Sequence, residues 1–231
     1  NIKNVKAVLH LAAQSSGPKS FEEPDLDVQV NVLGTVNLIN FCKKNKIKKF
    51  IFASSGSVYG ISKRTRVDEK TDLIPISDYN KTKMVGEKIV QNFKKFFDII
   101  ILRPGTVCGV SESLRLDLTV NAMTFSALRY NRINVNGGSQ VRPQLNIKDM
   151  VRAYLFFLNS KIKFGIFNLG FENHSINKIA EMIKEKIPTA VIKKNKSIDL
   201  RSYRLYAQKI LNVGYKPIYS TSAAIEDLIR G

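Results

Sequence analysis

The segment "KFIFASS" (49–55) is a short apolar run that ends in two serines. Similar apolar runs stand before and after it, "AVLHLA" (7–12) and "DIIILRP" (98–104). Near-continuous apolar runs of this length are typical of strands that are buried on both faces of a parallel sheet. The three runs therefore predict three parallel strands.

Two amphipathic segments separate these runs, at 27–44 and 78–96. Their apolar residues recur at helical spacing, for example Val28, Val32 and Val36 in the first segment. Strand, helix, strand, helix, strand is the order of a doubly wound, Rossmann-like α/β domain. Because crossovers between parallel strands are right-handed, few other topologies remain.

After about residue 110 the alternation loosens, and we expect a smaller α/β lobe that is interleaved with the end of the sheet. The expected helices are 116–130, 147–160 and 175–187, with two short ones in the tail. Residues 133–143 are expected to form a strand that runs into a Gly-Gly turn, and 165–170 a further buried strand. The predicted domains are a partial NAD(P)-binding domain (1–110, with 146–170 returning to it) and a substrate-binding lobe (111–145 and 171–231).

The composition is that of an ordinary globular protein, with 44% hydrophobic and 24% charged residues. No apolar run approaches the roughly 20 residues that a membrane-spanning helix needs, so we expect no membrane association. Cys42 and Cys108 are the only cysteines and stand in no metal-binding pattern, which predicts no metal site and a cytoplasmic location. The first residues lack an initiator Met and a signal peptide, and we expect a fragment or a truncated product.

The formal net charge is +18, which could indicate nucleic acid or an anionic substrate. In the sequence, however, the basic residues are scattered over several short groups, at 43–49, 94–95 and 193–196. Such groups favour an ordinary solvated surface. Nucleic acid is therefore not expected as a partner.

The pattern Tyr-x-x-x-Lys occurs twice, as "YGISK" (59–63) and "YNKTK" (79–83). On a helix, residues four apart share a face, so the two side chains can reach one region; in a loop the spacing guarantees nothing. Gly60 follows Tyr59, at the end of the serine-bearing strand, so the first match is interpreted as coincidence. Tyr79 opens an amphipathic helix, and the serines of 54–57 stand at a strand end, where ligands of open α/β sheets bind.

Further segments carry a resemblance that runs nearly the whole chain. In order they are "VLHLAA" (8–13), "NVLGT" (31–35), "SSGSVYG" (54–60), "YNKTK" (79–83), "LRPGTVCG" (102–109), "RPQLNIKDM" (142–150), "DLRSYR" (199–204) and "LNVGYKP" (211–217). Together they resemble the extended short-chain dehydrogenases/reductases, the NAD-dependent epimerase/dehydratase group that acts on nucleotide sugars. One match would be weak, whereas this many in order are specific.

The resemblance implies that Ser55, Tyr79 and Lys83 are the catalytic residues. A free phenol has a pKa near 10, and a nearby ammonium group and a bound nicotinamide cation favour the phenolate and lower that value. Ser55 would hydrogen-bond the sugar hydroxyl while Tyr79 removes its proton. The implied cofactor is NAD, with NADP left open, because the residue that would distinguish them lies upstream of this chain.

The resemblance also implies two sets of binding residues. The cofactor set comprises Leu11, Ala12, Ala13, Gln14, Asn31, Ala53, Ser54, Tyr79, Lys83, Pro104 and Gly105. The substrate set, for a nucleotide-diphosphate sugar, comprises Ser55, Thr106, Asn121, Arg142 and Arg201. The two arginines are implied as clamps on the diphosphate, because a guanidinium group binds phosphate oxygens bidentately.

The sequence departs from the family pattern at two points, one that concerns the extent of the domain and one that concerns the reaction. The amino-terminal GxxGxxG loop is not in this sequence, so we expect the N-terminal βαβ part to be missing. Dehydratases place Asp-Glu after the catalytic Thr, whereas this chain has Gly56 and Ser57, which disfavours dehydration.

The leading prediction is an NAD(P)-dependent nucleotide-sugar epimerase that acts at C4 through a 4-keto intermediate. A nucleotide-4-keto-sugar reductase is the alternative. A non-catalytic Rossmann-like or RNA-associated protein is the alternative of another class. A homodimer through helices 27–44 and 79–95 is also implied by the resemblance.

Overall fold

The computed structural model describes residues 4–61, 66–196 and 202–231. The chain divides into two compact units. The first comprises Asn1–Gly60, Glu69–Pro104 and Ala153–Asn168, and the second comprises Ile61–Asp68, Gly105–Arg152 and Leu169–Gly231. The boundaries expected from the sequence near 110 and 146 compare with breaks at 105 and 153 in the structure.

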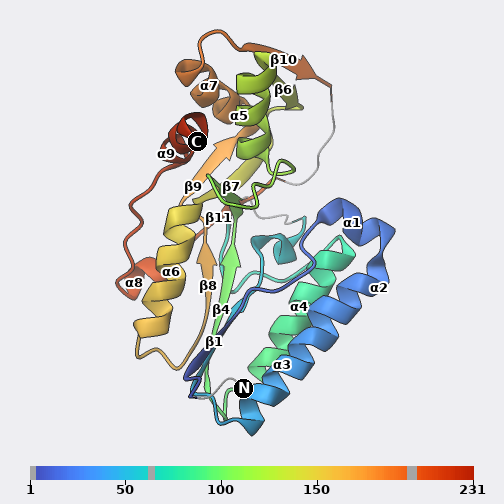
Figure 1. Ribbon diagram of the computed structural model, residues 1–231, viewed down its shortest axis with the longest axis vertical. Helices are drawn as coiled ribbons and strands as arrows, with labels where there is room; N and C mark the ends of the chain where they lie inside the picture. Colours follow the sequence, from blue (N-terminus) through green and yellow to red (C-terminus); the bar gives the residue numbers. More distant parts are fainter. Residues whose placement is uncertain (1–3, 62–65, 197–201) are drawn as a thin grey trace. The chain divides into compact units, whose positions relative to one another are not determined.

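The first unit is built on a four-stranded sheet (Figure 1). Its strands are β1 (Ala7–His10), β2 (Lys49–Ala53), β4 (Asp98–Pro104) and β8 (Phe164–Leu169), in the order β1-β2-β4-β8. β1, β2 and β4 pair in parallel, with Val8 opposite Phe50 and Phe50 opposite Ile99. The three apolar runs thus form the three parallel strands that the sequence predicts.

Helices cover both faces of this sheet, as expected for a doubly wound fold (Figure 1). One face carries α3 (Gly34–Lys44) and α4 (Asp78–Gln91), whose Ile39 and Val90 pack against alternate residues of β2 and β4. α6 (Ile147–Asn159) lies over the other face, where its Phe157 contacts Phe167 of β8 at 4.5 Å between ring centroids. The α/β fold class predicted from the sequence is therefore confirmed.

The predicted helix 27–44 is in fact three consecutive elements. α2 (Pro24–Asp27) leads into a π-helical segment, Val28–Leu33, and then into α3. A short helix not expected from the sequence, α1 (Gly17–Glu22), precedes them. The predicted helix 78–96 ends earlier, at Gln91.

The second unit combines three small sheets with helices. The sheets are β5 (Thr106–Cys108), β7 (Val141–Asn146) and β9 (Glu172–Ser175); β6 (Arg132–Asn136) and β10 (Val191–Asn195); and β3 (Arg66–Val67) and β11 (Arg204–Leu205). The helices α5 (Thr119–Tyr130), α7 (Ile176–Lys186) and α9 (Thr221–Arg230) supply most of an apolar core with β6, and α8 (Gln208–Asn212) is a short helix in the tail. Among the described residues, no helix is both long enough and apolar enough to cross a membrane.

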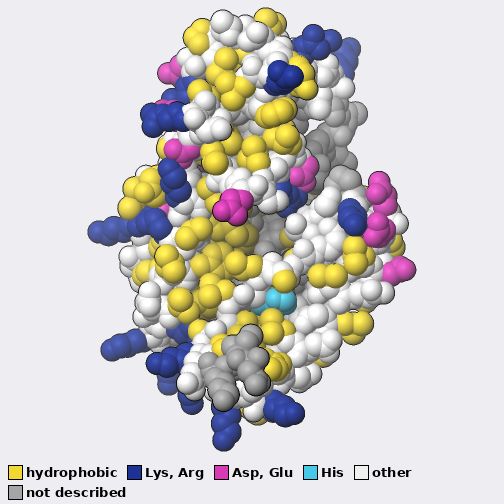
Figure 2. All heavy atoms as spheres, in the orientation of Figure 1, with side chains coloured by type: hydrophobic (Ala, Val, Ile, Leu, Met, Phe, Trp, Pro, Cys, Tyr) yellow, Lys and Arg dark blue, Asp and Glu magenta, His cyan; other side chains and the backbone are white. Residues whose placement is uncertain are grey.

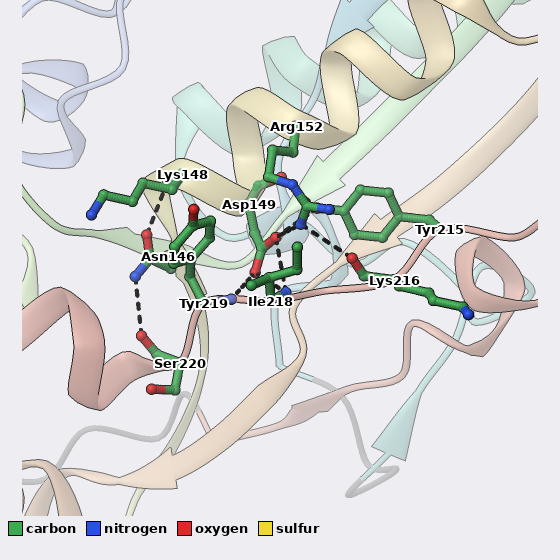
Figure 3. A network of polar contacts seen from close by, with 9 residues as sticks. All are labelled: Asn146, Lys148, Asp149, Arg152, Tyr215, Lys216, Ile218, Tyr219 and Ser220. Atoms are coloured by element: carbon green, nitrogen blue, oxygen red, sulfur yellow. Dashed lines mark hydrogen bonds and ion pairs between the residues drawn. The ribbon is translucent and has the colours of Figure 1, made fainter.

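A buried carboxylate fixes the tail of the second unit (Figure 3). Asp149 is fully buried and accepts hydrogen bonds from the backbone N–H groups of Ile218 (2.9 Å) and Tyr219 (2.7 Å) and from the Tyr215 hydroxyl (2.9 Å). Arg152, one turn later on α6, also donates to it. Asp149 is therefore the centre of the contacts that hold the segment between α8 and α9, to which Arg152 and Asn146 add bonds to the carbonyls of Lys216 (3.1 Å) and Ser220 (3.0 Å).

We expect Asp149→Asn to destabilise the protein by about 2 kcal/mol, because the new amide N–H₂ would face donors that now bind a carboxylate oxygen. The cost stays moderate since Arg152 is partly exposed and can be hydrated. Urea unfolding gives the loss, and limited proteolysis should show earlier cleavage between residues 212 and 221. Unchanged cleavage there would show that other contacts hold the segment.

Candidate active site

The carboxyl ends of the strands in the first unit gather a group of hydroxyl side chains. β2 ends at Ala53, and Ser54 and Ser55 lead directly into a 3₁₀ turn, Gly56–Tyr59. Ser55 caps this turn, since its Oγ accepts a hydrogen bond from the backbone N–H of Ser57 at 3.2 Å. The serine cluster is therefore ordered by its own backbone.

The hydroxyl of Ser55 has a defined orientation. Ser57 donates its single hydroxyl hydrogen to Oδ1 of Asn80, so in the 2.7 Å contact between the two serine oxygens it is Ser55 that donates. The Ser55 oxygen keeps one lone pair beyond the bond from Ser57 N–H. Ser55 can therefore accept a hydrogen bond from an incoming hydroxyl group.

Helix α4, which carries Tyr79 and Lys83, begins beside this serine-bearing strand end. Ser77 caps the helix, with its Oγ accepting from the Asn80 N–H at 3.3 Å, and Tyr79 lies half-buried in the first turn. Lys83 follows one turn later, is 3% exposed, and donates from Nζ to the Ala53 carbonyl at 2.9 Å. Two hydrogen bonds, Ser57 to Asn80 and Lys83 to Ala53, thus tie the serine-bearing strand end to the first turns of α4.

Gly86 explains how α4 can lie so close to β2. A Cβ atom at this position would stand 2.7 Å from the Phe52 ring, which is closer than real Cβ contacts. Any larger residue would push the helix outward and lengthen the bond from Lys83 to Ala53. Gly86 therefore sets the depth at which the Lys83 ammonium is buried.

Burial also lowers the proton affinity of two side chains at this edge. The pKa of Lys83 falls to about 8 because burial disfavours the ammonium form, and the negative charge of Asp27 opposes this shift. The pKa of His10 falls to about 4, first through burial and then through the positive charge of Lys83. Since Thr35 Oγ1 donates to the Asn31 carbonyl, the neutral His10 donates from Nε2 to Thr35 at 2.9 Å.

The lowered pKa of Lys83 predicts a pH dependence of stability. Between the folded value of about 8 and the ordinary value of 10.5, the unfolded chain binds more protons than the folded one, so stability rises with pH. From pH 7.5 to 9.5, we expect the free energy of unfolding of the wild type to rise by about 2 kcal/mol relative to Lys83→Met. Urea unfolding of both proteins measures this difference. Parallel curves would show that Lys83 titrates as it does in water.

A buried network of polar side chains forms a hydrogen bond to the backbone of the first turn of α4. Asp27 is fully buried and accepts from the Gln14 amide (2.8 Å) and from the Ser20 hydroxyl. Ser20 Oγ in turn accepts from the backbone N–H of Tyr79 at 2.7 Å. Asn31 accepts from the Gln14 N–H and donates to the Gln14 carbonyl, both at 3.0 Å. The backbone of Tyr79 is therefore fixed by a carboxylate that the sequence analysis did not single out.

A second buried network joins β2, α4 and β4. Glu87 accepts from Arg103 at Nε (2.9 Å) and Nη2 (2.6 Å) and also from the Ser54 hydroxyl. Arg103 Nη1 donates to the Tyr59 hydroxyl (2.9 Å), which donates to Asn168 Oδ1 (2.7 Å). Both charged side chains are almost fully buried. Sequence patterns gave no signal for this network, because its members come from distant segments.

Tyr59 is a core residue rather than a catalytic one. Its side chain is fully buried, and burial raises the pKa of its hydroxyl to about 12, against the opposing effect of Arg103. It closes the 3₁₀ turn and is not the end of a strand, since β2 stops at Ala53. Lys63, the other half of "YGISK", lies outside the described residues.

The predicted cofactor residues lie in two settings. Just after β1, Leu11 and Ala12 are exposed to solvent and Ala13 is half-buried. Five other predicted cofactor residues have buried side chains. These five buried residues are Gln14, Asn31, Ala53, Ser54 and Pro104. Gly105 belongs to the second unit, where a Cβ atom would stand 2.9 Å from the Pro143 carbonyl oxygen.

Three of the predicted substrate residues, Thr106, Asn121 and Arg142, belong to the second unit. Thr106 begins β5 and is half-buried. Asn121 is buried, accepts from the Gly109 N–H (3.0 Å) and donates to the Arg115 carbonyl (3.2 Å), so it shapes the loop before α5. Arg142 donates to the Val141 carbonyl at 3.1 Å. Arg201 lies outside the described residues.

Comparison with known proteins identifies this arrangement. The sequence profile of the NAD dependent epimerase/dehydratase family matches residues 1–170. The chain belongs to this family. A Methanocaldococcus jannaschii protein provisionally named UDP-glucose 4-epimerase is 31% identical over 240 residues, covering 100% of this chain and 78% of that protein. The UDP-glucuronate 4-epimerase of Thermodesulfobacterium geofontis is 32% identical, covering 80% of this chain and 58% of that protein.

The fold of this family member is shared with a solved epimerase. The UDP-glucuronic acid 4-epimerase of Bacillus cereus, in complex with UDP-glucuronic acid and NAD, superimposes with a TM-score of 0.86 at 29% identity. The match covers 97% of this chain and 76% of that one. The Rossmann-like fold, the extended dehydrogenase/reductase type and the assignment as an enzyme are therefore confirmed.

Proposed function

We propose that the protein is an NAD-dependent nucleotide-sugar epimerase acting at C4, with Tyr79 as the base. One observation carries this proposal: the bonds Ser57–Asn80 and Lys83–Ala53 tie Ser55 to the helix that bears Tyr79 and Lys83. A serine acceptor, a phenol and a buried ammonium at one sheet edge suit the removal of a proton from a sugar hydroxyl.

The first unit supplies residues that suit NAD. Leu11 is 53% exposed at the carboxyl end of β1, and a bound cofactor would cover it. The Lys83 ammonium has three N–H groups, of which the bond to Ala53 uses one among the described residues. NAD, when bound, would accept a hydride from the sugar carbon and later return it. We propose Leu11 to Gln14, Asn31, Ala53, Ser54, Tyr79, Lys83, Pro104 and Gly105 as its binding residues.

Each proposed catalytic residue has a separate task. Ser55 accepts the hydrogen bond of the sugar hydroxyl, because its own hydrogen is directed at Ser57. Tyr79 takes the proton of that hydroxyl and later gives it back. Lys83 stabilises the phenolate electrostatically, and it does so best below about pH 8, where the ammonium form persists. The buried Asp27 favours that ammonium form.

We propose a nucleoside diphosphate sugar as the substrate. Its support is that the relatives reported above are named for UDP-glucose or UDP-glucuronate epimerisation. Thr106, Asn121, Arg142 and Arg201 are proposed as its contacts in the second unit. Dehydration is not proposed, because Gly56 and Ser57 offer no acidic side chain beside Ser55.

Product assays with UDP-, dTDP- and GDP-hexoses test the proposal on the full-length protein. We expect interconversion of the C4 epimers without net consumption of added NAD. Net loss of NADPH with a 4-keto-sugar substrate would instead assign a reductase. No turnover of any nucleotide sugar, with NAD binding intact, would remove the enzymatic proposal.

Further features of the whole protein are also proposals, because the chain spans about 58–78% of the length of the two relatives above. We propose a homodimer through the helices of 27–44 and 79–95, whose exposed faces carry Leu33, Phe41 and Val85. A cytoplasmic location is proposed on the two cysteines, both of which are free and buried.

A further inference from the structure

The structure gathers lysines that are scattered in the sequence. Four segments precede the strands of the first unit at the edge opposite the proposed active site: 4–6, 43–48, 92–98 and 160–163. They contain nine lysines, all exposed, and a single acidic residue, Asp98. The lysines are Lys6, Lys43, Lys44, Lys46, Lys48, Lys94, Lys95, Lys161 and Lys163. This set is called the basic edge below.

Backbone hydrogen bonds establish that these segments are neighbours. The Lys48 N–H donates to the Lys6 carbonyl (3.0 Å), the Asp98 N–H to the Lys48 carbonyl (2.9 Å) and the Ile99 N–H to the Lys163 carbonyl (2.8 Å). Adjacent strands lie about 4.8 Å apart, so ammonium groups from four strand starts are held within reach of one another. Figure 2 shows Lys and Arg side chains gathered at the lower end of the first unit, where these strands begin.

A position at a helix C-terminus, where positive charge is favourable, explains only two of the nine lysines of the basic edge. Lys43 and Lys44 lie in the last turn of α3, where positive charge stabilises a helix. The other seven lysines stand in loops or at strand starts, outside the described helices. So many like charges repel one another, and an anionic partner would relieve this repulsion. Nine of the chain's 37 basic residues but only one of its 19 acidic residues lie in these segments.

Two exposed phenylalanines lie among these lysines. Phe96 is 53% exposed, with Lys43 Nζ 4.1 Å from its ring centroid, and Phe164 is 44% exposed, with Lys94 Nζ 5.7 Å from its ring centroid. Exposed phenyl rings beside lysines suit a surface that offers anionic headgroups above an apolar layer. Nucleic-acid surfaces favour arginine, whose planar fork binds phosphate and stacks on bases, and the four segments contain none.

We propose that the basic edge docks the protein onto anionic lipid bilayers. Its lysines would lie against the headgroups, and Phe96 and Phe164 would enter the boundary with the acyl chains. This inference is independent of the proposed activity, since it uses the opposite edge of the sheet. It also departs from the sequence analysis, which expected no membrane association and interpreted the scattered basic residues as an ordinary solvated surface.

Co-sedimentation with vesicles tests the proposal. We expect binding to phosphatidylcholine vesicles in which about a third of the lipid is phosphatidylglycerol, and much weaker binding to pure phosphatidylcholine. Binding should fall steeply as salt shortens the Debye length from about 10 Å at 0.1 M to about 3 Å at 1 M. Lack of binding to the anionic vesicles at low salt overturns the proposal.

Two charge-matched variants separate a specific patch from the overall charge. Replacing Lys46, Lys94, Lys95 and Lys161 with Ala should weaken vesicle binding on the order of 1,000-fold, at about 1 kcal/mol per lysine. Replacing Lys178, Lys193, Lys194 and Lys196, which are exposed in the second unit, removes the same charge and should have little effect. Equal losses in the two variants would overturn the proposal.

Single-stranded polyuridylate, added as a competitor, distinguishes the two kinds of polyanion. We expect polyuridylate to bind more weakly than anionic vesicles. If phenyl rings enter the bilayer, Phe96→Ala should also weaken vesicle binding several-fold while the unfolding midpoint stays unchanged. Tighter binding of polyuridylate that depends on the same four lysines would assign the basic edge to RNA and overturn the lipid proposal.

Discussion

Replacing Tyr79 with phenylalanine is expected to lower turnover by about 10²–10⁴-fold, which is the usual contribution of a positioned general base. Phenylalanine keeps the ring and the helix but removes the oxygen that takes the proton. The backbone N–H of Tyr79 remains bonded to Ser20, so the first turn of α4 keeps its position. Because only proton transfer is lost, kcat should fall while KM changes little. Steady-state assays of C4 epimerisation give both constants.

Two other tyrosines serve as controls for this change. Tyr130 is 67% exposed at the end of α5, and Tyr130→Phe should leave both turnover and stability unchanged. Tyr59 is the tyrosine of the other Tyr-x-x-x-Lys match, and Tyr59→Phe should cost about 1–3 kcal/mol of stability, because Arg103 and Asn168 lose a buried partner. The folded fraction of that variant should retain its turnover. Undiminished turnover of Tyr79→Phe itself would exclude Tyr79 as the base.

The sheet of the first unit could be predicted because burial on both faces leaves a direct trace in the sequence. β2 and β4 are buried along almost their whole length, and their apolar runs stand out. β9, with the sequence "ENHS", and the mostly exposed β10 carry no such trace, since backbone pairing with β7 and β6 suffices to form them. The segment 133–143 does begin as a strand, β6, that runs into Gly137 and Gly138, but the residues after them start a second strand, β7, which lies in a different sheet from β6.

The catalytic trio could be proposed from the sequence because its motifs are local, whereas its supporting residues are not. Tyr79 and Lys83 lie four positions apart on one helix, and Ser55 follows a strand. Asp27 stands at the start of an amphipathic segment, where an acidic residue normally caps a helix in solvent. Only the fold buries it beneath Tyr79, through Ser20. The orientation of Ser55 by Ser57 and Asn80 likewise depends on residues 23 positions apart.

Breaking the buried ion pair between Glu87 and Arg103 is expected to destabilise the first unit strongly. Glu87→Gln should cost about 3–5 kcal/mol, because it leaves the Arg103 charge buried without a counter-charge. The new amide would also point an N–H₂ group at a guanidinium N–H. Urea unfolding monitored by circular dichroism measures the loss. Glu23→Gln is the matched control, since Glu23 faces Lys19 at 3.7 Å on the surface, and it should cost less than about 0.5 kcal/mol.

The double variant Glu87→Leu/Arg103→Met shows how much the intact ion pair itself contributes to the free energy of unfolding, apart from the cost of leaving one charge unpaired. Removing both charges at once should restore most of the stability, to within about 1 kcal/mol of the wild type, since an apolar pair avoids the desolvation cost. The restored protein should still turn over more slowly than the wild type, because Ser54, next to Ser55, loses its bond to Glu87. A loss below about 1 kcal/mol in Glu87→Gln would mean that water reaches Arg103 in solution. The network would then not be what holds the carboxyl ends of β2 and β4 against α4.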